Sequence, residues 1–594
     1  MDLKMKDFVK TTLAVICGVL ILQILGFVMF LISLGSMAAA GGGKVVLPRE
    51  GVLDVNMADF ALVEQAQEQM PSFGAGGVNM QVPVGLYDAV KAVQTAAADP
   101  GIKYILLRAD GLASGIASAE EFRTALSDFR ESGKAVVAYT ENPSNGSYYL
   151  ASVADKVFMT SYHGGNPMLV GVSGRMIFLK DLLDKLGVNY QLIRHGKYKS
   201  AGEMYIKNAP SEENRLQNQA MIDGVWREIS GSIAASRGLT LEKLNALVDG
   251  LKLNEPEDFL AEGLVDELLD HEGLISKLCT LAGVEKVEDL HLIPFADYVE
   301  AKKAVKPSKT QVAVLFADGS IVDGDEPKEI AADRFVREID KIRKDESVKA
   351  VVLRVNSPGG SVVASEKIRV ALNLLKAEKP LVASYGNYAA SGGYWISNNC
   401  QKIFSDATTL TGSIGVFSMI PEFSKVASKV GVNVVTVGSN KHSDMYALIR
   451  PFDKEETAVM QEYVDRIYDE FVGIVAEGRS LDKARVDELA QGRVWVGSDA
   501  LTNELVDQIG TLKDAISEAA SLAGLISEED YGVACYPKPL TIFEQIMESL
   551  GKGTEGPSIL DGTPFEAIGL ALQRLEENMP SGVYAQLPYS IEIR

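Results

Sequence analysis

The stretch VVLRVNSPGGSVVASEKIRVALNLLKAEKPLVAS, residues 351–384, decides the fold of this chain. It begins with a β-branched apolar run at 351–355, passes through a glycine turn at 357–361, and then spaces apolar residues as a helix does over 364–375. A second apolar run follows at 380–384. The order strand, turn, helix, strand predicts parallel strands, and continuous apolar runs indicate strands buried on both faces. The sequence therefore predicts an α/β domain.

An earlier copy of the same unit lies in the first half of the chain. The segment DPGIKYILLR at 99–108 matches DESVKAVVLR at 345–354, an offset of 354 − 108 = 246 residues. LGVN at 186–189 matches VGVN at 430–433, an offset of 433 − 189 = 244 residues. Self-similarity at a nearly fixed offset is the signature of a duplicated structural unit. We expect two tandem α/β domains.

The expected segments follow from this repeat and from the composition of the ends of the chain. They are a basic N-terminus at 1–10, an apolar segment at 11–43, a first domain at 44–300, a linker at 301–310, a second domain at 311–540 and a C-terminal tail at 541–594.

The apolar segment 11–43 carries no charged residue and is long enough to cross the ~30 Å hydrocarbon core of a bilayer. Basic residues within 1–10 precede it, and such residues favour the cytoplasmic side. We expect a transmembrane anchor, with everything after Lys44 outside the cytoplasm. The alternative is a cleaved signal peptide, because small residues suited to cleavage lie at 36–40.

Composition excludes several classes of function. A net charge of −22 argues against nucleic acid as a partner. One cysteine lies in the apolar segment, and the other three, Cys279, Cys400 and Cys535, are far apart in the sequence. This spacing fits neither a disulfide framework nor a zinc site, although one pair could still be bridged. We expect no metal and no cofactor.

Ser391 is the candidate nucleophile. It lies in YAASGG at 388–393, which follows the glycine turn NSPGG at 356–360. Backbone N–H groups in such a turn can stabilise developing negative charge. A serine hydroxyl needs a base, and no histidine lies between the two segments. The base must come from elsewhere in the chain.

The first half lacks these elements. At the offset of the repeat, Asn145 takes the position of Ser391, and LAS at 112–114 takes the position of the glycines. The first half has therefore lost the nucleophile and the turn.

The second half, in turn, lacks a lysine that the first half has. Lys197 aligns with Lys441, but Lys199 aligns with Ser443. The simplest complete site joins Lys199 of one half to Ser391 of the other.

A lysine acts as a general base near neutral pH only if its pKa is strongly lowered, through burial away from water or through nearby positive charge. If the segment is extended, Lys197 and Lys199 share a face near Arg194, and charge repulsion would lower the pKa. Lys197 is a rival base. His195 and His442 flank these positions and leave a Ser–His arrangement open.

Four segments together resemble the signal peptide peptidase A family in its long, duplicated form, which belongs to the Clp-protease/crotonase-like group. The segments are GKYKSA at 196–201, NSPGGS at 356–361, AASGGY at 389–394 and LTGSIG at 410–415. The resemblance covers residues 1–540 and implies two tandem crotonase/Clp-like α/β domains after a transmembrane helix.

The resemblance also implies roles for individual residues. Ser391 would be the nucleophile and Lys199 the general base. Backbone N–H groups of Gly360 and Gly392 would form the oxyanion hole, and the hydroxyl of Ser413 would orient the lysine amine.

Two positions qualify the resemblance. The Clp relatives place a histidine base where this chain has Val416, which agrees with a lysine base. The run SAGEM at 200–204 differs from the pattern expected after the family's lysine, which affects the expected loop shape more than the chemistry.

The function implied is that of a membrane-anchored serine endopeptidase that degrades signal peptides and other hydrophobic peptides. The family resemblance implies a bacterial inner-membrane location, periplasmic catalytic domains and a homotetramer whose sites face an inner cavity. Two alternatives remain open, a non-catalytic scaffold with the same fold and a crotonase-type acyl-CoA enzyme. The second is disfavoured because the chain has no evident basic phosphate site.

Overall fold

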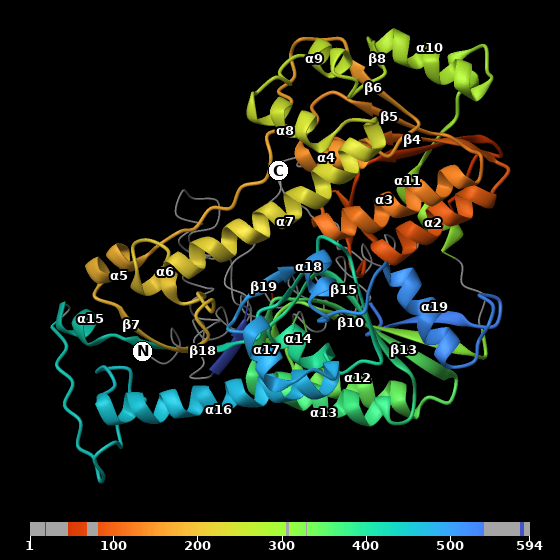
Figure 1. The fold of residues 1–594 in the computed structure, drawn as a ribbon. Coiled ribbons are helices and arrows are strands. Elements are labelled where there is room, and N and C mark those ends of the chain that lie inside the picture. The colour runs from red at the N-terminus through yellow and green to blue at the C-terminus, as the bar shows by residue number, and fades with distance from the viewer. Residues whose placement is uncertain are drawn as a thin grey trace, which may run out of the picture.

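The computed structural model describes Gly18 and residues 45–67, 81–303, 308–327, 329–429, 431–539 and 583–586. The expected anchor at 11–43, apart from Gly18, and the expected tail, apart from 583–586, lie outside these ranges. No helix within the described ranges is both long enough and apolar enough to span a membrane. In Figure 1 most of the first half of the chain forms the upper lobe, its residues 180–206 extend to the lower left, and the second half forms the lower lobe.

The first half is built on a parallel sheet in the order β8-β6-β5-β4-β1-β9. Its strands are β1 (Gly51–Asn56), β4 (Ile102–Arg108), β5 (Val136–Thr140), β6 (Lys156–Thr160), β8 (Glu267–Leu269) and β9 (Leu292–Pro294). A small parallel pair joins β2 (Phe60–Val63) to β3 (Val82–Gly85). The helices are α2 (Leu86–Ala98), α3 (Ile116–Glu131), α4 (Asn145–Ala151), α5 (Lys180–Leu186), α6 (Glu203–Ile206), α7 (Glu212–Arg237), α8 (Leu241–Asp249), α9 (Pro256–Ala261), α10 (His271–Ala282), the short η1 (Val287–Asp289) and α11 (Phe295–Lys302).

The second half repeats this plan with a sheet in the order β19-β17-β15-β13-β10-β21, in which β16 joins β15 to β20. Its strands are β10 (Gln311–Asp318), β13 (Val348–Ser357), β15 (Leu381–Ala390), β16 (Lys402–Ser405), β17 (Leu410–Gly412), β19 (Val494–Val496), β20 (Gln508–Ile509) and β21 (Gly532–Tyr536). Its helices are α12 (Ala332–Lys344), α13 (Val362–Lys376), α14 (Gly392–Ser397), α15 (Ser424–Lys429), α16 (Lys454–Arg479), α17 (Lys483–Leu489), α18 (Gly497–Thr502) and α19 (Leu512–Leu522).

The predicted unit at 351–384 is confirmed, because β13, α13 and β15 follow in that order and the two strands pair in parallel. The duplication is also visible in the structure. Strand β13 begins 348 − 102 = 246 residues after β4, and α13 begins 362 − 116 = 246 residues after α3. The chain is therefore a tandem duplication of a mixed α/β unit.

A third sheet connects the halves, in the order β12-β11-β14-β22-β18-β7. Strand β7 belongs to the first half but pairs antiparallel with β18 over its whole length, from Asn189 opposite Glu422 to His195 opposite Val416. The strands of this sheet are β7 (Asn189–His195), β11 (Ile321–Val322), β12 (Ile330–Ala331), β14 (Gly359–Ser361), β18 (Val416–Glu422) and β22 (Val583–Gln586). The alignment places a counterpart of β7 after residue 433, but described residues 434–450 form no strand. The repeat is not kept at this point, and β7 pairs with a strand of the other half.

The hydrophobic cores of the two halves interlock. Ile193 of β7 is buried in the core of the second half. Ala390 and Leu410 of the second half are buried in the core of the first. The residues that flank the candidate nucleophile are thus held by packing from both halves.

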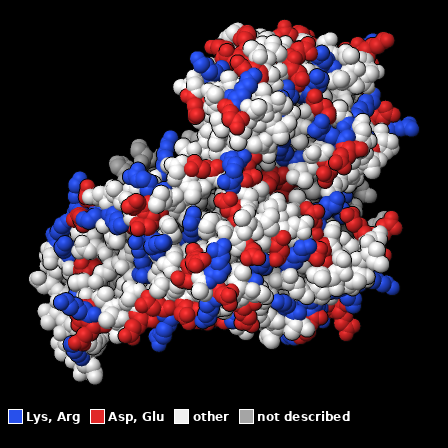
Figure 2. All heavy atoms as spheres, viewed as in Figure 1, with Lys and Arg blue, Asp and Glu red and all other residues white. Residues whose placement is uncertain are grey.

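Charges of both signs cover the molecule. In the view of Figure 2, Lys and Arg side chains alternate with Asp and Glu side chains over both lobes. Cys279, Cys400 and Cys535 are free thiols, which settles the pairing that the sequence left open for these three.

Candidate active site

Ser391 lies at the junction between β15 and α14, in a backbone conformation that few residues adopt. Its φ is 56° and its ψ is −112°. Its N–H donates to the carbonyl of Gly412 at 2.8 Å, and its carbonyl accepts from the N–H of Trp395 at 2.8 Å. A non-glycine residue at positive φ is uncommon, and such strain persists only where the surroundings fix it. The surroundings here hold the hydroxyl of Ser391 in one place.

Lys199 follows β7 in a tight turn against the second half. Its N–H donates to the carbonyl of Gly196 at 3.1 Å, and the preceding N–H, of Tyr198, donates to the carbonyl of Gln491 at 2.9 Å. Gly492 has a φ of +78°, and a Cβ there would lie only 2.7 Å from the Cβ of Lys199. Glycine is required at 492 because the backbone of Lys199 passes too close for any side chain.

The structure brings together three of the residues named from the sequence. Lys199 Nζ donates to Ser391 Oγ at 2.7 Å. It also donates to Ser413 Oγ at 2.9 Å and to the Ser413 carbonyl at 3.0 Å. All three residues are completely buried. The amine of Lys199, in the first half, therefore lies between two hydroxyls of the second half.

Burial sets the protonation of this amine. It lowers the pKa of Lys199 well below its usual value of 10.5, because the charged form loses its hydration. The three contacts of Nζ are all to uncharged oxygens, so no carboxylate compensates. Burial therefore favours the neutral amine, and the lone pair of its Nζ is the group that could accept the hydroxyl proton of Ser391.

Of the two expected causes of this shift, burial is found and charge repulsion is not. Lys197 is exposed, with its Nζ 5.3 Å from the centre of the Tyr198 ring, and does not share a face with Lys199. The segment is a turn rather than an extended strand, so the two lysines point in different directions. Arg194 is paired with Glu203 at 3.1 Å. Burial, not charge repulsion, lowers the pKa of Lys199.

Arg194 and Glu203 instead form a support beneath the lysine. Arg194 Nη1 donates to the Lys199 carbonyl at 2.8 Å and to Glu203 Oε1 at 3.1 Å. Burial raises the pKa of Glu203, but hydrogen bonds from Ser211 and Asn214 outweigh it and lower the pKa to about 2. Glu203 stays ionised at any physiological pH and holds Arg194 against the turn.

Ser413 is also fixed by its backbone, between β17 and β18. It has a φ of 51°, and its N–H donates to the carbonyl of Arg493 at 2.7 Å. The resulting orientation points both its hydroxyl and its carbonyl at Lys199.

The glycine turn lies directly beside the start of α14. A Cβ on Gly392 would lie 3.0 Å from the backbone nitrogen of Gly360, so the two backbones are in close contact. A Cβ on Gly360 would lie 1.9 Å from the carbonyl of Ile321, which no side chain can tolerate. Glycine is needed at both positions so that these segments can approach Ser391.

The histidine alternatives are not found at the nucleophile. His195 Nδ1 lies 2.7 Å from Asp465 Oδ1, and its ring stacks on Tyr468. His442 Nδ1 lies 2.8 Å from Glu456 Oε1. Within the described ranges, the side chain bonded to Ser391 Oγ is Lys199.

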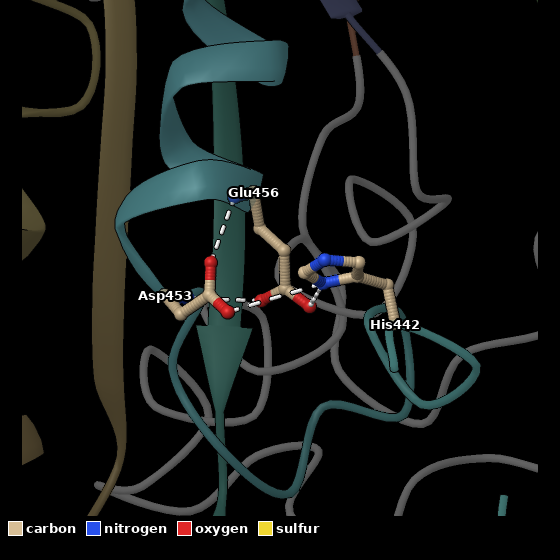
Figure 3. A group of neighbouring side chains, drawn as sticks. All are labelled: His442, Asp453 and Glu456. Atoms are coloured by element: carbon tan, nitrogen blue, oxygen red, sulfur yellow. Dashed lines mark hydrogen bonds and ion pairs between the residues drawn. The ribbon is translucent and has the colours of Figure 1, made fainter. Parts of the chain in front are cut away.

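His442, Asp453 and Glu456 place potential metal ligands within 4.8 Å of one another (Figure 3). Asp453 and Glu456 are, however, the two members of a capping box at the start of α16. Arg450 also donates to both carboxylate oxygens of Glu456 at 2.7 Å. Because the Arg450 guanidinium already neutralises the Glu456 carboxylate, we interpret these three residues as a helix cap with ion pairs rather than as a metal site.

Asn145, the counterpart of Ser391, has a structural role. Its Oδ1 accepts from the N–H groups of Val170 and Gly171 at 3.1 and 3.0 Å, and its Nδ2 donates to the Gly171 carbonyl at 2.9 Å. The position that holds the hydroxyl in the second half thus anchors a loop in the first.

The sequence did not predict the roles of Gly492 or of the Arg194–Glu203 pair. Their significance depends on contacts between segments that are distant in the chain, and the repeat gave no match for them. The glycine in QGR at 491–493 carries no signal that distinguishes it from an ordinary turn glycine.

Comparison with known proteins agrees with this arrangement. The model of peptidase family S49 matches residues 128–285 and 373–526. The chain is 36% identical over 517 residues to Protease 4 of Haemophilus influenzae, covering 84% of this chain and 83% of that protein. It is 35% identical over 489 residues to Protease 4 of Salmonella typhi, covering 80% and 78%. It is 29% identical over 470 residues to the chloroplastic serine protease SPPA of Arabidopsis thaliana, covering 78% and 69%.

Proposed function

Because this chain belongs to peptidase family S49 and is a serine endopeptidase of the signal peptide peptidase A type, we propose that Ser391 is its nucleophile and Lys199 its general base. The observation that carries the proposal is the buried 2.7 Å contact between Lys199 Nζ and Ser391 Oγ. The dyad is split between the two halves of the duplication.

The first step is attack by Ser391 Oγ on the carbonyl carbon of the scissile peptide bond. The proton of the hydroxyl passes to the neutral amine of Lys199, which becomes an ammonium. The Ser413 hydroxyl and carbonyl hold that amine in line with Oγ. The backbone N–H groups of Gly360 and Gly392 stabilise the negative charge on the carbonyl oxygen.

The second step expels the amine of the leaving peptide. The Lys199 ammonium gives its proton to that nitrogen, so the amine leaves neutral and an acyl ester remains on Ser391. Water then attacks the ester while Lys199 takes one of its protons, and the Lys199 ammonium gives that proton to Ser391 Oγ as the acid product leaves. Each cycle returns Lys199 to its neutral form.

The wider setting belongs to the same proposal. The protein would degrade signal peptides and other hydrophobic peptides from a position in the bacterial inner membrane. The apolar segment 11–43 would be its anchor, with the domains at 44–300 and 311–540 in the periplasm and the tail at 541–594. Both domains would be of the crotonase/Clp type, and the protein would assemble as a homotetramer. The apolar composition of 11–43 and the four sequence motifs support this setting.

A fluorescent phosphonate that reacts with activated serines tests the dyad. We expect labelling of the wild-type chain and none of Ser391→Ala or Lys199→Ala, with Asn145→Ala labelled like the wild type. Peptide hydrolysis should fall by several orders of magnitude in the first two variants. Labelling of Ser391→Ala at the wild-type rate would show that the nucleophile lies elsewhere.

Reporter fusions test the orientation. A reporter that works only outside the cytoplasm should be active when fused after Lys44. Activity from a cytoplasm-specific reporter at the same junction would reverse the topology.

A further inference from the structure

Helix α7 brings a buried glutamine of the first half against a strand of the second half. Gln217 is 2% exposed, and its Nε2 donates to the carbonyl of Val494 at 2.8 Å. The N–H of Val494 donates in return to Gln217 Oε1 at 3.1 Å. Val494 belongs to β19, which α7 contacts as it descends from the upper lobe (Figure 1). One side chain therefore bonds to both backbone groups of a residue in the other half.

Strand β19 needs this partner because it lies at the end of its sheet. Among the described strands, β19 pairs with β17 alone. The outer edge of an end strand has N–H and C=O groups that require other partners when they are buried. Val494 is 3% exposed, and the carboxamide of Gln217 supplies both hydrogen bonds, as a further strand would.

Residues 491–493, directly before this contact, touch the catalytic candidates of both halves. Gly492 lies so close to the backbone of Lys199 that there is no room for a side chain. The carbonyl of Arg493 accepts from the N–H of Ser413 at 2.7 Å. The position of this segment therefore sets the positions of Lys199 and Ser413, whose Nζ and Oγ are 2.9 Å apart.

The repeat contains a matching glutamine in the second half. Gln461 of α16 follows Gln217 by 461 − 217 = 244 residues, the offset that also relates residue 189 to residue 433. Its Nε2 donates to the carbonyl of Arg194 in β7 at 3.2 Å. Each copy of the glutamine thus bonds to the backbone of a strand from the other half, and each of these strands lies at an end of its sheet.

We propose that Gln217 is a positioning residue of the peptidase, which fixes segment 491–494 and through it the meeting of Lys199 with Ser413. The inference rests on the proposed Ser–Lys mechanism and adds a residue to it. Without the carboxamide, the buried N–H and C=O of Val494 lose their bonds, and β19 shifts to recover them. Catalysis falls steeply when reacting groups move by about 1 Å.

Gln217→Met tests the proposal, because methionine is similar in length and cannot form these two hydrogen bonds. Gln219→Met is the matched control on the same helix, since Gln219 is exposed and donates to Asp223 of α7 at 2.7 Å. Steady-state kinetics on a fluorogenic peptide gives kcat and KM. A fluorescent phosphonate gives the fraction of molecules labelled at Ser391 and the rate of labelling. A residue that only stabilises the fold changes the labelled fraction, whereas a positioning residue changes the rate.

We expect Gln217→Met to lower kcat and the labelling rate about tenfold, with KM and the labelled fraction little changed. Gln219→Met should match the wild type. Gln217→Ala covers the case in which methionine is not accommodated, because it leaves space for water to bond to Val494. It should lower kcat by a similar factor, since a water molecule does not hold the strand in place.

Three results would overturn the inference. They are a wild-type kcat and labelling rate in both Gln217 variants, a fall in the labelled fraction alone, and an equal loss of activity in Gln219→Met. In each case the wild type would still be labelled at Ser391, so the peptidase proposal would stand. Absence of labelling in the wild type would instead contradict the proposed function itself.

Discussion

The guanidinium of Arg354 lies 2.7 Å from the carboxylate of Glu121, and this ion pair joins the two halves of the chain in a fully buried position. Arg354 also lies 2.8 Å from Glu64. The counterpart of Arg354 in the first half, Arg108, instead pairs with Asp54 of its own half, and 38% of its side chain is exposed. Of the two duplicated arginines, only Arg354 contacts the other half of the chain through its ion pairs.

Replacing Arg354 should therefore destabilise the protein strongly. Arg354→Leu leaves the carboxylates of Glu64 and Glu121 buried without a counter-charge, which typically costs about 3–5 kcal/mol. Arg108→Leu should cost only about 1 kcal/mol, because its ion pair is partly exposed. Urea unfolding followed by circular dichroism measures both. Equal shifts in the two midpoints would contradict a special role for the interface.

The carboxyl of Asp406 should make stability depend on pH. Burial, followed by the nearby charges of Glu121 and Glu120, raises the pKa of Asp406 well above its usual value. A raised pKa means that the folded chain holds a proton that the unfolded chain releases near pH 4. The contribution to stability is complete below that pH and is lost as pH rises through the folded pKa.

Asp406→Asn should remove the stability lost at high pH, because the asparagine amide is uncharged at every pH, like the protonated carboxyl of Asp406. The variant should melt at a higher temperature than the wild type at pH 8, and this difference should shrink towards pH 4. Asp325→Asn, at an exposed position, is the control and should change little. A gain of the same size at both pH values would refute the linkage.

Lys199→Arg should be nearly inactive, whereas Lys197→Arg should keep most of the wild-type rate. A guanidinium stays protonated and cannot accept the proton of Ser391, while Lys197 is exposed and outside the site. In the wild type, kcat/KM should rise with pH through an ionisation below 10.5, the usual pKa of lysine. If His195→Ala abolished activity while Lys199→Arg did not, the base would be a histidine.

Gly492→Ala should displace Lys199 and lower kcat by about a hundredfold or more, since catalysis is sensitive to shifts of about 1 Å. Gly431 provides a close control. It has the same φ of +78°, but a Cβ there meets nothing within 4 Å. Both variants suffer the same backbone strain, so any difference in kcat measures the clash with Lys199. Similar rates for the two variants would show that the close contact at 492 is unimportant.

Ser413→Ala should lower kcat about tenfold with little change in KM, because one hydrogen bond to the amine of Lys199 is lost while the Ser413 carbonyl remains. Ser443→Ala, at the position aligned with Lys199, should have no effect. Steady-state kinetics on both variants measures kcat and KM. An unchanged kcat for Ser413→Ala would show that the Ser413 hydroxyl has no role in catalysis.

The sequence predicted those features that depend on local pattern. The parallel unit formed by β13, α13 and β15 follows from apolar runs and helical spacing within 34 residues. The meeting of Lys199 with Ser391 was also predicted, because the duplication made the missing member of each half visible. Repeats supply long-range information that a single domain would not contain.

The features that were missed depend on pairing between distant segments. The turn at Lys199 is set by Gly492, nearly three hundred residues away, so the segment looked extended when read alone. The crossing of β7 to β18 breaks the repeat, and no local pattern records which edge a strand will join. The same holds for β22, whose four residues resemble any short apolar stretch.

The pairing of β7 with β18 has a consequence for biosynthesis. The ribosome makes Lys199 well before it makes residues 416–422. Until then, Lys199 lacks both the strand β18 that pairs with β7 and the second-half serines that surround its amine. In that interval its ammonium is hydrated and cannot act as a base. Lys199 and Ser391 therefore meet only when the second half of a molecule has closed on the first, and under the proposed mechanism peptidase activity begins only at that point.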